Sequence, residues 1–388
     1  MGYRKKTPVN GHMRNYMWIF LVICMALFDM QPSVLVDAKH QNRECYSAIY
    51  SFGDSLADTG NLLISGAQQF GPISELPYGQ TYFNKPTGRC SNGRLIVDFI
   101  AQAYGFQFLP PFLDKHADFS NGANFAVAGA TAMDASFFEE RHIEPIFTNF
   151  SLDTQIEWFK TFKENYCYGT PDCADHFENA LFLIGEIGGN DYNYPFAQGR
   201  SLEEVSTFVP LIVQKIKGAI EELIDEGAKK FFVQGNLPIG CSPFYLTTQQ
   251  TNSSADLDHM GCLVKFNNFS QYSNLHIRNM LLDVQGKHQN ISIIYADYFS
   301  AALKVLSNPK QYGLQRNVLR VCCGRGGKYN FSPPTSCSPN VSSCLNPEQY
   351  FNWDGVHLTE TAYRTIAKMF VDGKFTTPKI CRQKVHSK

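Results

Sequence analysis

The chain has 388 residues, of which 44% are hydrophobic and 18% are charged, so it is long and apolar enough for a globular protein with a large core. Its formal net charge is −1 and it has no basic block, which argues against nucleic-acid binding, because phosphate contacts need clustered cations. The 31 Phe and 19 Tyr residues fit either apolar ligand pockets or an ordinary aromatic core.

The N-terminal segment has the pattern of a signal peptide. Basic residues at positions 4, 5, 6 and 14 precede the apolar run 17–28, which is too short to cross a bilayer, since a helical span needs about 20 residues. Val36-Asp37-Ala38 offers a cleavage site with small residues, so the mature chain is expected to start near Lys39. We therefore expect a signal peptide at 1–38 and a single domain at 39–388. A membrane anchor is the alternative.

Sequons and cysteines also favour the secretory route. Cys24 lies in the expected signal peptide, so 11 of the 12 cysteines remain in the mature chain. We expect a secreted or vacuolar glycoprotein with disulfides. The six candidate glycosylation sites are Asn149, Asn252, Asn268, Asn290, Asn330 and Asn340.

Short spacings suggest part of the disulfide connectivity, which spacing alone does not fix. The suggested pairs are Cys167 with Cys173, Cys241 with Cys262, and Cys322 and Cys323 with Cys337 and Cys344 in either order. An odd number of cysteines leaves at least one thiol free or paired outside the chain. A zinc site over 322–344 is the alternative, although no nearby His supplies a familiar ligand spacing.

Short apolar runs alternate with helical patterns along the chain. The predicted strands are 46–52, 123–128, 180–187, 230–234 and 291–296. The predicted helices are 96–104, 152–164, 203–226, 263–285 and 359–371, and Pro210 predicts a break in the third of them. This alternation predicts βαβ units, and hence a parallel sheet with helices on both faces.

Segments rich in glycine and polar residues follow three predicted strands, at the edge where parallel sheets bind ligands. Gly53-Asp54-Ser55 follows the first strand, Gly129 the second and Gly188-Gly189-Asn190-Asp191 the third. Ser55 is also expected to open a helix, whose N-terminus would favour negative charge. A fourth segment, Asp354-Gly355-Val356-His357, precedes the last predicted helix.

These residue types fit nucleophilic catalysis. The hydroxyl of Ser55 needs a base, which His357 can supply, and the carboxylate of Asp354 can orient the imidazole. An oxyanion needs N–H donors, for which the candidates are the backbone amides of Ser55 and Gly129 and the side-chain amide of Asn190. Such chemistry implies no metal and no organic cofactor. Motifs of other enzyme classes are absent: the sequence has no G-x-S-x-G, no H-E-x-x-H, no Walker loop and no dinucleotide fingerprint.

The order of four segments carries a family resemblance. FGDSLADTGN, NGANFAVAGAT, GGND and DGVHLTE occur in this order, with TGRCSNGRLIVDFIA, LPIGC and VCCG between them. From about Tyr46 to its C-terminus, the chain resembles the plant GDSL esterase/lipase family of the SGNH hydrolases. The resemblance implies a flavodoxin-like α/β/α sandwich of three layers around a five-stranded parallel sheet. Asn92 stands where the family commonly has Asp, in a segment that we take as structural.

The resemblance also implies roles for individual residues. Ser55 would be the nucleophile, with Asp354 and His357 as the remaining catalytic pair. Gly129 and Asn190 would be oxyanion-hole donors. Gly122, in the same segment as Gly129, is the alternative glycine donor.

The substrate is less well defined by the sequence. GEIGGNDYNYPF and the residues after TGRC most resemble a plant subgroup that includes sinapine esterases and acetylajmalan esterase. We therefore expect a monomeric carboxylesterase without a membrane span, acting on a small specialised-metabolite ester such as an acetylated alkaloid or a phenolic ester. Acyl transfer to another alcohol, hydrolysis of longer acyl chains and a non-catalytic binding role are the alternatives.

Overall fold

The computed structural model describes residues 1–2, 45–66, 72–144, 147–169, 171–315, 317–333 and 337–381. The expected signal peptide, apart from its first two residues, and its cleavage site lie outside the described residues. Residues Glu44–Lys388 form one compact unit. Among the described residues, no helix is both long and apolar enough to cross a membrane.

A six-stranded β-sheet with the order β2-β1-β3-β4-β5-β6 forms the centre of this unit. Strands β1 to β5 are parallel, as the sequence predicts. The predicted count of five needs one correction, because β6 pairs antiparallel with β5 at the edge, and its two residues are too few to show a sequence pattern. The strands are β1 (Ile49–Phe52), β2 (Gly122–Asn124), β3 (Leu181–Ile184), β4 (Lys230–Gln234), β5 (Ser292–Ala296) and β6 (Thr376–Thr377).

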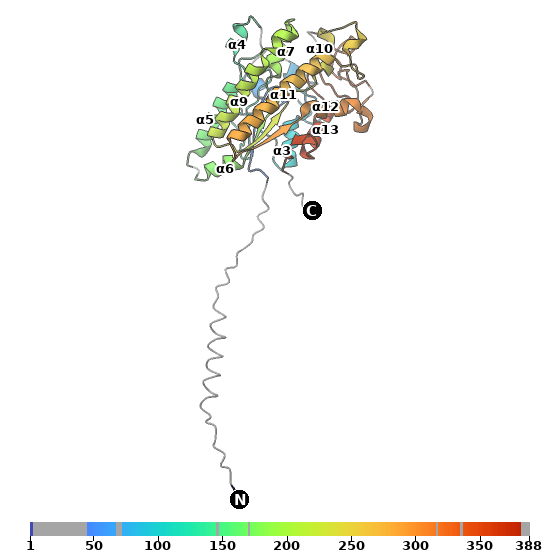
Figure 1. Cartoon of the computed structure of the whole chain (residues 1–388). Coiled ribbons are helices and arrows are strands. Elements are labelled where there is room, and N and C mark those ends of the chain that lie inside the picture. The colour runs from blue at the N-terminus through green and yellow to red at the C-terminus, as the bar shows by residue number, and fades with distance from the viewer. Residues whose placement is uncertain are drawn as a thin grey trace. The chain divides into compact units, whose positions relative to one another are not determined.

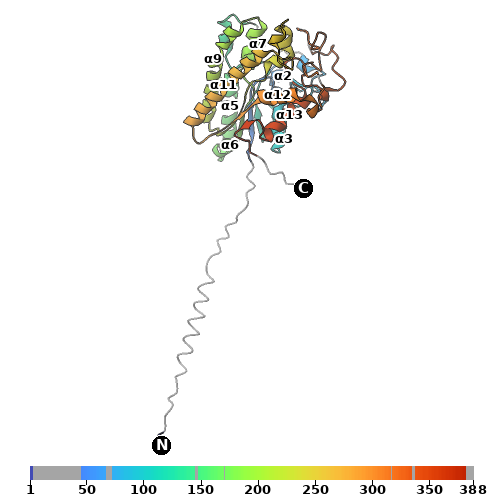
Figure 2. The same cartoon turned by 45° about the vertical axis from the view of Figure 1, so that its right-hand side comes forward.

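Helices cover both faces of the sheet, which confirms the predicted three-layer α/β/α sandwich (Figures 1 and 2). Helices α5, α9 and α11 pack together on one face, and α3, α12 and α13 on the other. The α-helices are α2 (Asn61–Ile64), α3 (Ile96–Ala103), α4 (Ala135–Glu139), α5 (Leu152–Cys167), α6 (Cys173–Asn179), α7 (Gly189–Ala197), α8 (Leu202–Ser206), α9 (Val209–Asp225), α10 (Pro243–Thr248), α11 (Val264–Lys287), α12 (Tyr298–Ser307) and α13 (Glu360–Val371). Short 3₁₀ helices are η2 (Ile239–Cys241), η3 (Ser254–Asp256), η4 (Pro309–Tyr312) and η5 (Pro347–Gln349).

All five predicted helices are present, with ends that differ by a few residues. The predicted break near Pro210 is confirmed, because residues 203–226 form two helices, α8 and α9. Pro210 lies in the first turn of α9. N–H groups in the first turn have no partner within the helix, so the missing N–H of proline costs no hydrogen bond there. The sequence does not predict α7, since GNDYNYPFA contains Pro195 and lacks a helical apolar period.

The second predicted strand, 123–128, is shorter than expected and ends at Asn124. The buried side chain of Asn61 binds the backbone at this end of the strand. Its Nδ2 donates to the carbonyl oxygens of Asn124 and Ala126 at 2.8 and 2.9 Å, and the Asn124 carbonyl also accepts the N–H of Phe112 at 2.9 Å in an isolated bridge.

The expectation that Ser55 opens a helix is wrong. Ser55 lies in a turn, and α2 starts only at Asn61. The helix starts there because the carboxylate of Asp58 accepts the N–H groups of Gly60, Asn61 and Leu62, as a capping side chain does.

Disulfides cross-link the compact unit. The pairs Cys167–Cys173 and Cys241–Cys262 are confirmed, and the open order is settled as Cys322–Cys344 and Cys323–Cys337. Cys90 is a buried free thiol. Because the four cysteines of 322–344 pair with one another, the zinc alternative is excluded. The disulfides between described residues are Cys45–Cys381, Cys167–Cys173, Cys241–Cys262, Cys322–Cys344 and Cys323–Cys337.

Candidate active site

Ser55 lies in a tight turn directly after β1. Gly53 begins this turn with φ of 142°, a backbone region that glycine adopts readily. Gln155 of α5 holds Gly53 through two hydrogen bonds: Oε1 accepts the Gly53 N–H at 2.9 Å and Nε2 donates to the Gly53 carbonyl at 2.8 Å. The turn therefore holds Ser55, which is 6% exposed, at the carboxyl edge of the sheet.

Asp354 and His357 lie in a short loop before α13. The Trp353 N–H donates to the His357 carbonyl at 2.8 Å and closes this loop. Gly355 has φ of 110°, and a Cβ there would lie 2.3 Å from the ring of Phe331. Glycine is therefore required at position 355 for both backbone conformation and space.

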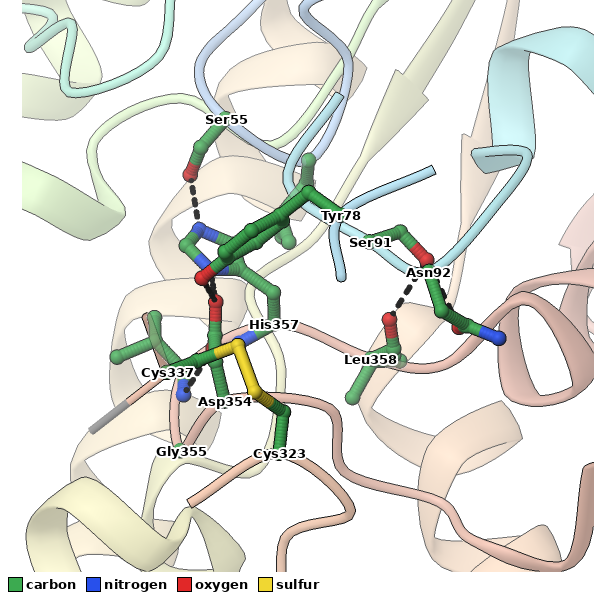
Figure 3. Close-up of polar contacts among 12 residues, drawn as sticks. Ser55, Tyr78, Ser91, Asn92, Cys323, Cys337, Asp354, Gly355, His357 and Leu358 are labelled. Carbon is green, nitrogen blue, oxygen red and sulfur yellow. Dashed lines mark hydrogen bonds and ion pairs between the residues drawn. A yellow bond between two sulfur atoms is a disulfide. The ribbon is translucent and has the colours of Figure 1, made fainter. Parts of the chain in front are cut away.

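Two neighbouring segments support the loop from outside (Figure 3). The Cys323 N–H donates to the Trp353 carbonyl at 2.8 Å, and Cys323 is itself held by its disulfide with Cys337. On the other side, Ser91 Oγ donates to the Leu358 carbonyl at 3.1 Å. These contacts fix the loop relative to the sheet.

The loop places His357 between Ser55 and Asp354 (Figure 3). Ser55 Oγ lies 2.7 Å from His357 Nε2, and Asp354 Oδ2 lies 2.7 Å from His357 Nδ1. Asp354 Oδ1 also accepts the backbone N–H of His357 at 2.9 Å, so the carboxylate holds both the ring and the main chain. With the proton on Nδ1, Nε2 can accept the proton of Ser55, as a nucleophilic serine requires.

The charges of Asp354 and His357 stabilise each other. Burial would raise the pKa of Asp354, but the positive charge of His357 and hydrogen bonds from His357 and Tyr78 outweigh burial and lower the pKa to about 2. Burial would lower the pKa of His357, but the negative charge of Asp354, its hydrogen bond and the interaction with Cys90 together outweigh burial and raise that pKa. Asp354 therefore stays ionised at neutral pH and makes the imidazole a stronger base.

Gly129 lies in the loop after β2, which is tied to the turn of Ser55. The Val127 N–H donates to the Gly53 carbonyl at 3.2 Å. Gly129 has φ of 83°. Within the described ranges, the backbone N–H groups of Ser55 and Gly129 donate to no protein acceptor, so both are available for an oxyanion.

Gly122 lies at the opposite end of β2. It pairs in register with Ile49, the first residue of β1, whereas Ser55 follows the last residue of that strand. Its position favours Gly129 as the glycine donor.

Asn190 lies in the first turn of α7, directly after β3. Its Nδ2 donates to Asp54 Oδ2 at 3.1 Å and to the Ala130 carbonyl at 2.9 Å. Both amide protons thus have protein partners, and an oxyanion would replace one of them. The bond to Asp54 is the longer of the two.

Three buried residues beside the candidate triad are missed by the sequence. Tyr78 donates its hydroxyl proton to Asp354 Oδ2 at 2.7 Å. The buried thiol of Cys90 interacts electrostatically with His357. Glu186 lines the pocket beside Ser55. Only Cys90 carries a sequence signal, the odd number of cysteines, and nothing in that signal points to the site.

Asp54 and Glu186 form a buried carboxyl pair. They are 3% and 7% exposed, and their side chains are in hydrogen-bonding contact. Burial raises the pKa of both residues, and the charge of Asp54 raises the pKa of Glu186 further. Two adjacent carboxylates resist ionising together, so we expect this pair to share a proton.

A pocket beside Ser55 has a largely apolar wall. Leu237, Ile239, Phe269 and Phe351 contribute to this wall. Among the described residues, neither Lys nor Arg lines the pocket. Such a wall fits the hydrocarbon part of an ester better than an anionic group.

The six sequon asparagines differ in accessibility. Asn330 is partly buried, and its Nδ2 donates to the Val321 carbonyl at 3.2 Å. A glycan at Asn330 would leave Nδ2 a single proton for this bond. The exposed asparagines are Asn149, Asn252, Asn268, Asn290 and Asn340.

Residues 49–370 match the family model described as GDSL-like lipase/acylhydrolase. This match covers most of the chain, and the chain belongs to that family.

Relatives from Arabidopsis thaliana agree with the family match. Three proteins, each named as a GDSL esterase/lipase, are 46%, 45% and 43% identical to this chain. The alignments cover 86%, 86% and 92% of this chain, and 92%, 87% and 94% of the respective relatives. The protein is therefore a carboxylic ester hydrolase.

Proposed function

We propose that the protein is a secreted serine carboxylesterase that hydrolyses a small ester through an acyl-enzyme on Ser55. The observation that carries this proposal is the position of His357, with its two ring nitrogens 2.7 Å from Ser55 Oγ and from Asp354 Oδ2. Secretion is supported by the disulfides and by the signal-peptide pattern of the sequence.

Acylation begins when Ser55 Oγ attacks the ester carbonyl carbon and passes its proton to His357 Nε2. The tetrahedral intermediate collapses by breaking the bond to the alcohol oxygen, which takes the proton from His357. The alcohol leaves, and the acyl group stays on Ser55. Asp354 stabilises the imidazolium while it exists.

Deacylation repeats these steps with water as the nucleophile. His357 accepts a proton from water as the water oxygen bonds to the acyl carbon. The bond to Ser55 Oγ then breaks, and Ser55 recovers its proton from His357. In both halves the backbone amides of Ser55 and Gly129 and the side chain of Asn190 stabilise the oxyanion.

The proposed substrate is a small specialised-metabolite ester, such as an acetylated alkaloid or a phenolic ester. The largely apolar wall and the absence of Lys and Arg among the described lining residues support a substrate without a negative charge near the scissile bond.

Ser55→Ala tests the mechanism. We expect kcat on acetyl and phenolic esters to fall by roughly 10⁵-fold or more, because no other group supplies the nucleophile. Labelling by a serine-directed fluorophosphonate should disappear with it. Ser136→Ala, at an exposed position on α4, is the matched control and should keep both activity and labelling. Full activity in Ser55→Ala would refute the mechanism, and a higher kcat/KM for long-chain esters would refute only the small-ester assignment.

A further inference from the structure

Tyr78 is a buried tyrosine whose hydroxyl lies beside the candidate triad. It belongs to the segment between α2 and α3, far in sequence from the loop that holds Asp354. The residue is 5% exposed, and its ring packs edge-on against Trp353, with 5.9 Å between ring centroids. Its hydroxyl reaches Asp354 Oδ2 at 2.7 Å (Figure 3).

The direction of this hydrogen bond is fixed by chemistry. Burial and the negative charge of Asp354 raise the pKa of Tyr78, so its hydroxyl keeps its proton. An ionised carboxylate only accepts hydrogen bonds, so Tyr78 must be the donor. Asp354 Oδ2 therefore accepts two hydrogen bonds, one from the Tyr78 hydroxyl and one from His357 Nδ1.

The remaining oxygen of this carboxylate is also occupied. Asp354 Oδ1 accepts the backbone N–H groups of Val356 at 3.1 Å and His357 at 2.9 Å. Those two donors belong to the same short loop as Asp354. Tyr78 is the donor that comes from a different part of the fold, and it ties the carboxylate to the segment before α3.

We propose that Tyr78 is a positioning residue for ester hydrolysis: its hydroxyl holds the Asp354 carboxylate toward His357 and weakens it as an acceptor for the Nδ1 proton. The inference rests on the proposed function, because it assigns His357 the role of general base. Tyr78 is not among the described residues that line the pocket beside Ser55.

Tyr78→Phe removes the hydroxyl and keeps the ring against Trp353. Without the hydroxyl, the carboxylate of Asp354 is less well held, and kcat should fall by about tenfold with little change in KM. The freed carboxylate is also a stronger acceptor and stabilises the imidazolium of His357 more. The pKa of His357 therefore rises. In the pH profile of kcat/KM, the acid limb, where activity is lost as His357 is protonated, should move to higher pH by about half a unit.

Other titratable groups around His357 are unchanged by this substitution. The thiol of Cys90 interacts electrostatically with His357, and Tyr363 on α13 interacts electrostatically with Asp354. Asp54 and Glu186 interact electrostatically with His357 from the side of Ser55. Because all of these remain in Tyr78→Phe, a moved acid limb reports the lost hydroxyl.

Tyr82→Phe is the matched control. Tyr82 lies on the same segment and is 42% exposed, so it loses a hydroxyl at the surface. This variant should keep the kcat and the acid limb of the wild type. Thermal midpoints of the variants would verify that each is folded.

A second readout does not depend on turnover. The proton between His357 Nδ1 and Asp354 should give a strongly deshielded ¹H NMR signal, which we expect to shift in Tyr78→Phe and to stay in place in Tyr82→Phe. A Tyr78→Phe enzyme with unchanged kcat, acid limb and NMR signal would overturn the inference. Loss of Ser55-dependent activity is a different result: if the wild type itself shows none, the proposed function fails, whatever Tyr78 does.

Discussion

Glu186 shows how burial at a single residue can link the stability of the protein to pH. Its carboxyl is buried against Asp54 beside Ser55, and burial raises its pKa well above the ordinary value. A group whose pKa is raised by folding stabilises the folded state when it is protonated. That stabilisation is fully present below the pKa of the unfolded chain and is lost as pH rises through the folded pKa.

Glu186→Gln should therefore reduce the loss of stability on the alkaline side. Gln resembles the protonated acid in shape and can still donate to Asp54, but it does not ionise. Between pH 5 and pH 8, we expect the urea-unfolding free energy to fall less in Glu186→Gln than in the wild type, because Gln does not gain a charge that the buried site disfavours.

Glu164→Gln, at an exposed position on α5, is the matched control and should leave the pH dependence as it is in the wild type. An identical pH dependence in Glu186→Gln and the wild type would contradict the idea that Glu186 is held protonated.

At the residue scale, the sequence predicts the residues that lie within recognisable segments. It singles out Ser55, Asp354 and His357, which the fold brings into one hydrogen-bonded chain. It misses Tyr78, because this residue meets Asp354 across 276 positions and lies in a segment without regular periodicity. A contact of that kind depends on tertiary packing, which a single sequence does not display.

At the scale of elements, the segment before α3 is fastened to the helix by a buried ion pair. Arg89 donates from Nε and from its second terminal nitrogen to the carboxylate of Asp98, at 2.9 and 2.7 Å. Asp98 also accepts the backbone N–H of Leu95 at 2.8 Å and thereby caps the first turn of α3. The same segment contains Tyr78 and Cys90, so the ion pair between Arg89 and Asp98 helps to hold these two residues beside the candidate triad.

Asp98→Asn should destabilise the protein strongly. The substitution leaves the guanidinium of Arg89 buried without a negative partner. We expect the unfolding free energy to fall by about 3–5 kcal/mol. Denaturant unfolding measures the change. Glu157→Gln breaks an exposed pair with Lys160 on α5 and should cost less than about 1 kcal/mol. Equal effects of the two substitutions would contradict the assignment of Asp98 as the critical partner.

Helices with a clear apolar period could be predicted from the sequence, and α7 could not. Strands β3 and β4 are also apparent as short apolar runs, because both faces of a covered parallel sheet are buried. In contrast, α7 is held by specific contacts. Asp191 accepts the N–H groups of Ala132 and Met133 at 2.8 and 2.9 Å and ties the helix to the loop after β2.

At the scale of the whole molecule, alternation of strands and helices was sufficient to predict the layers of the sandwich. It did not predict which distant cysteines meet. Cys45 and Cys381 are 336 positions apart, and they pair because the segment before β1 and the segment after β6 converge in the folded state. The shorter pairs are visible as spacings, whereas this one depends on the complete fold.

Replacing both Cys45 and Cys381 by Ser should lower the unfolding free energy by about 2–4 kcal/mol, since the unfolded chain gains freedom when so long a loop opens. Replacing Cys167 and Cys173, which are 6 positions apart, should cost less, because the loop is short. The thermal unfolding midpoints of the variants, measured without added oxidant or reductant, give this comparison. A larger loss for the short pair would contradict the loop argument.

The bond between Cys45 and Cys381 also makes the chain between them a covalent ring. A protease that cuts one exposed loop of this ring opens it without releasing a fragment, so the nicked protein keeps its mass on a denaturing gel until it is reduced. Everything before Cys45 lies outside the ring. Removal of residues before Cys45 would therefore leave this covalent closure intact.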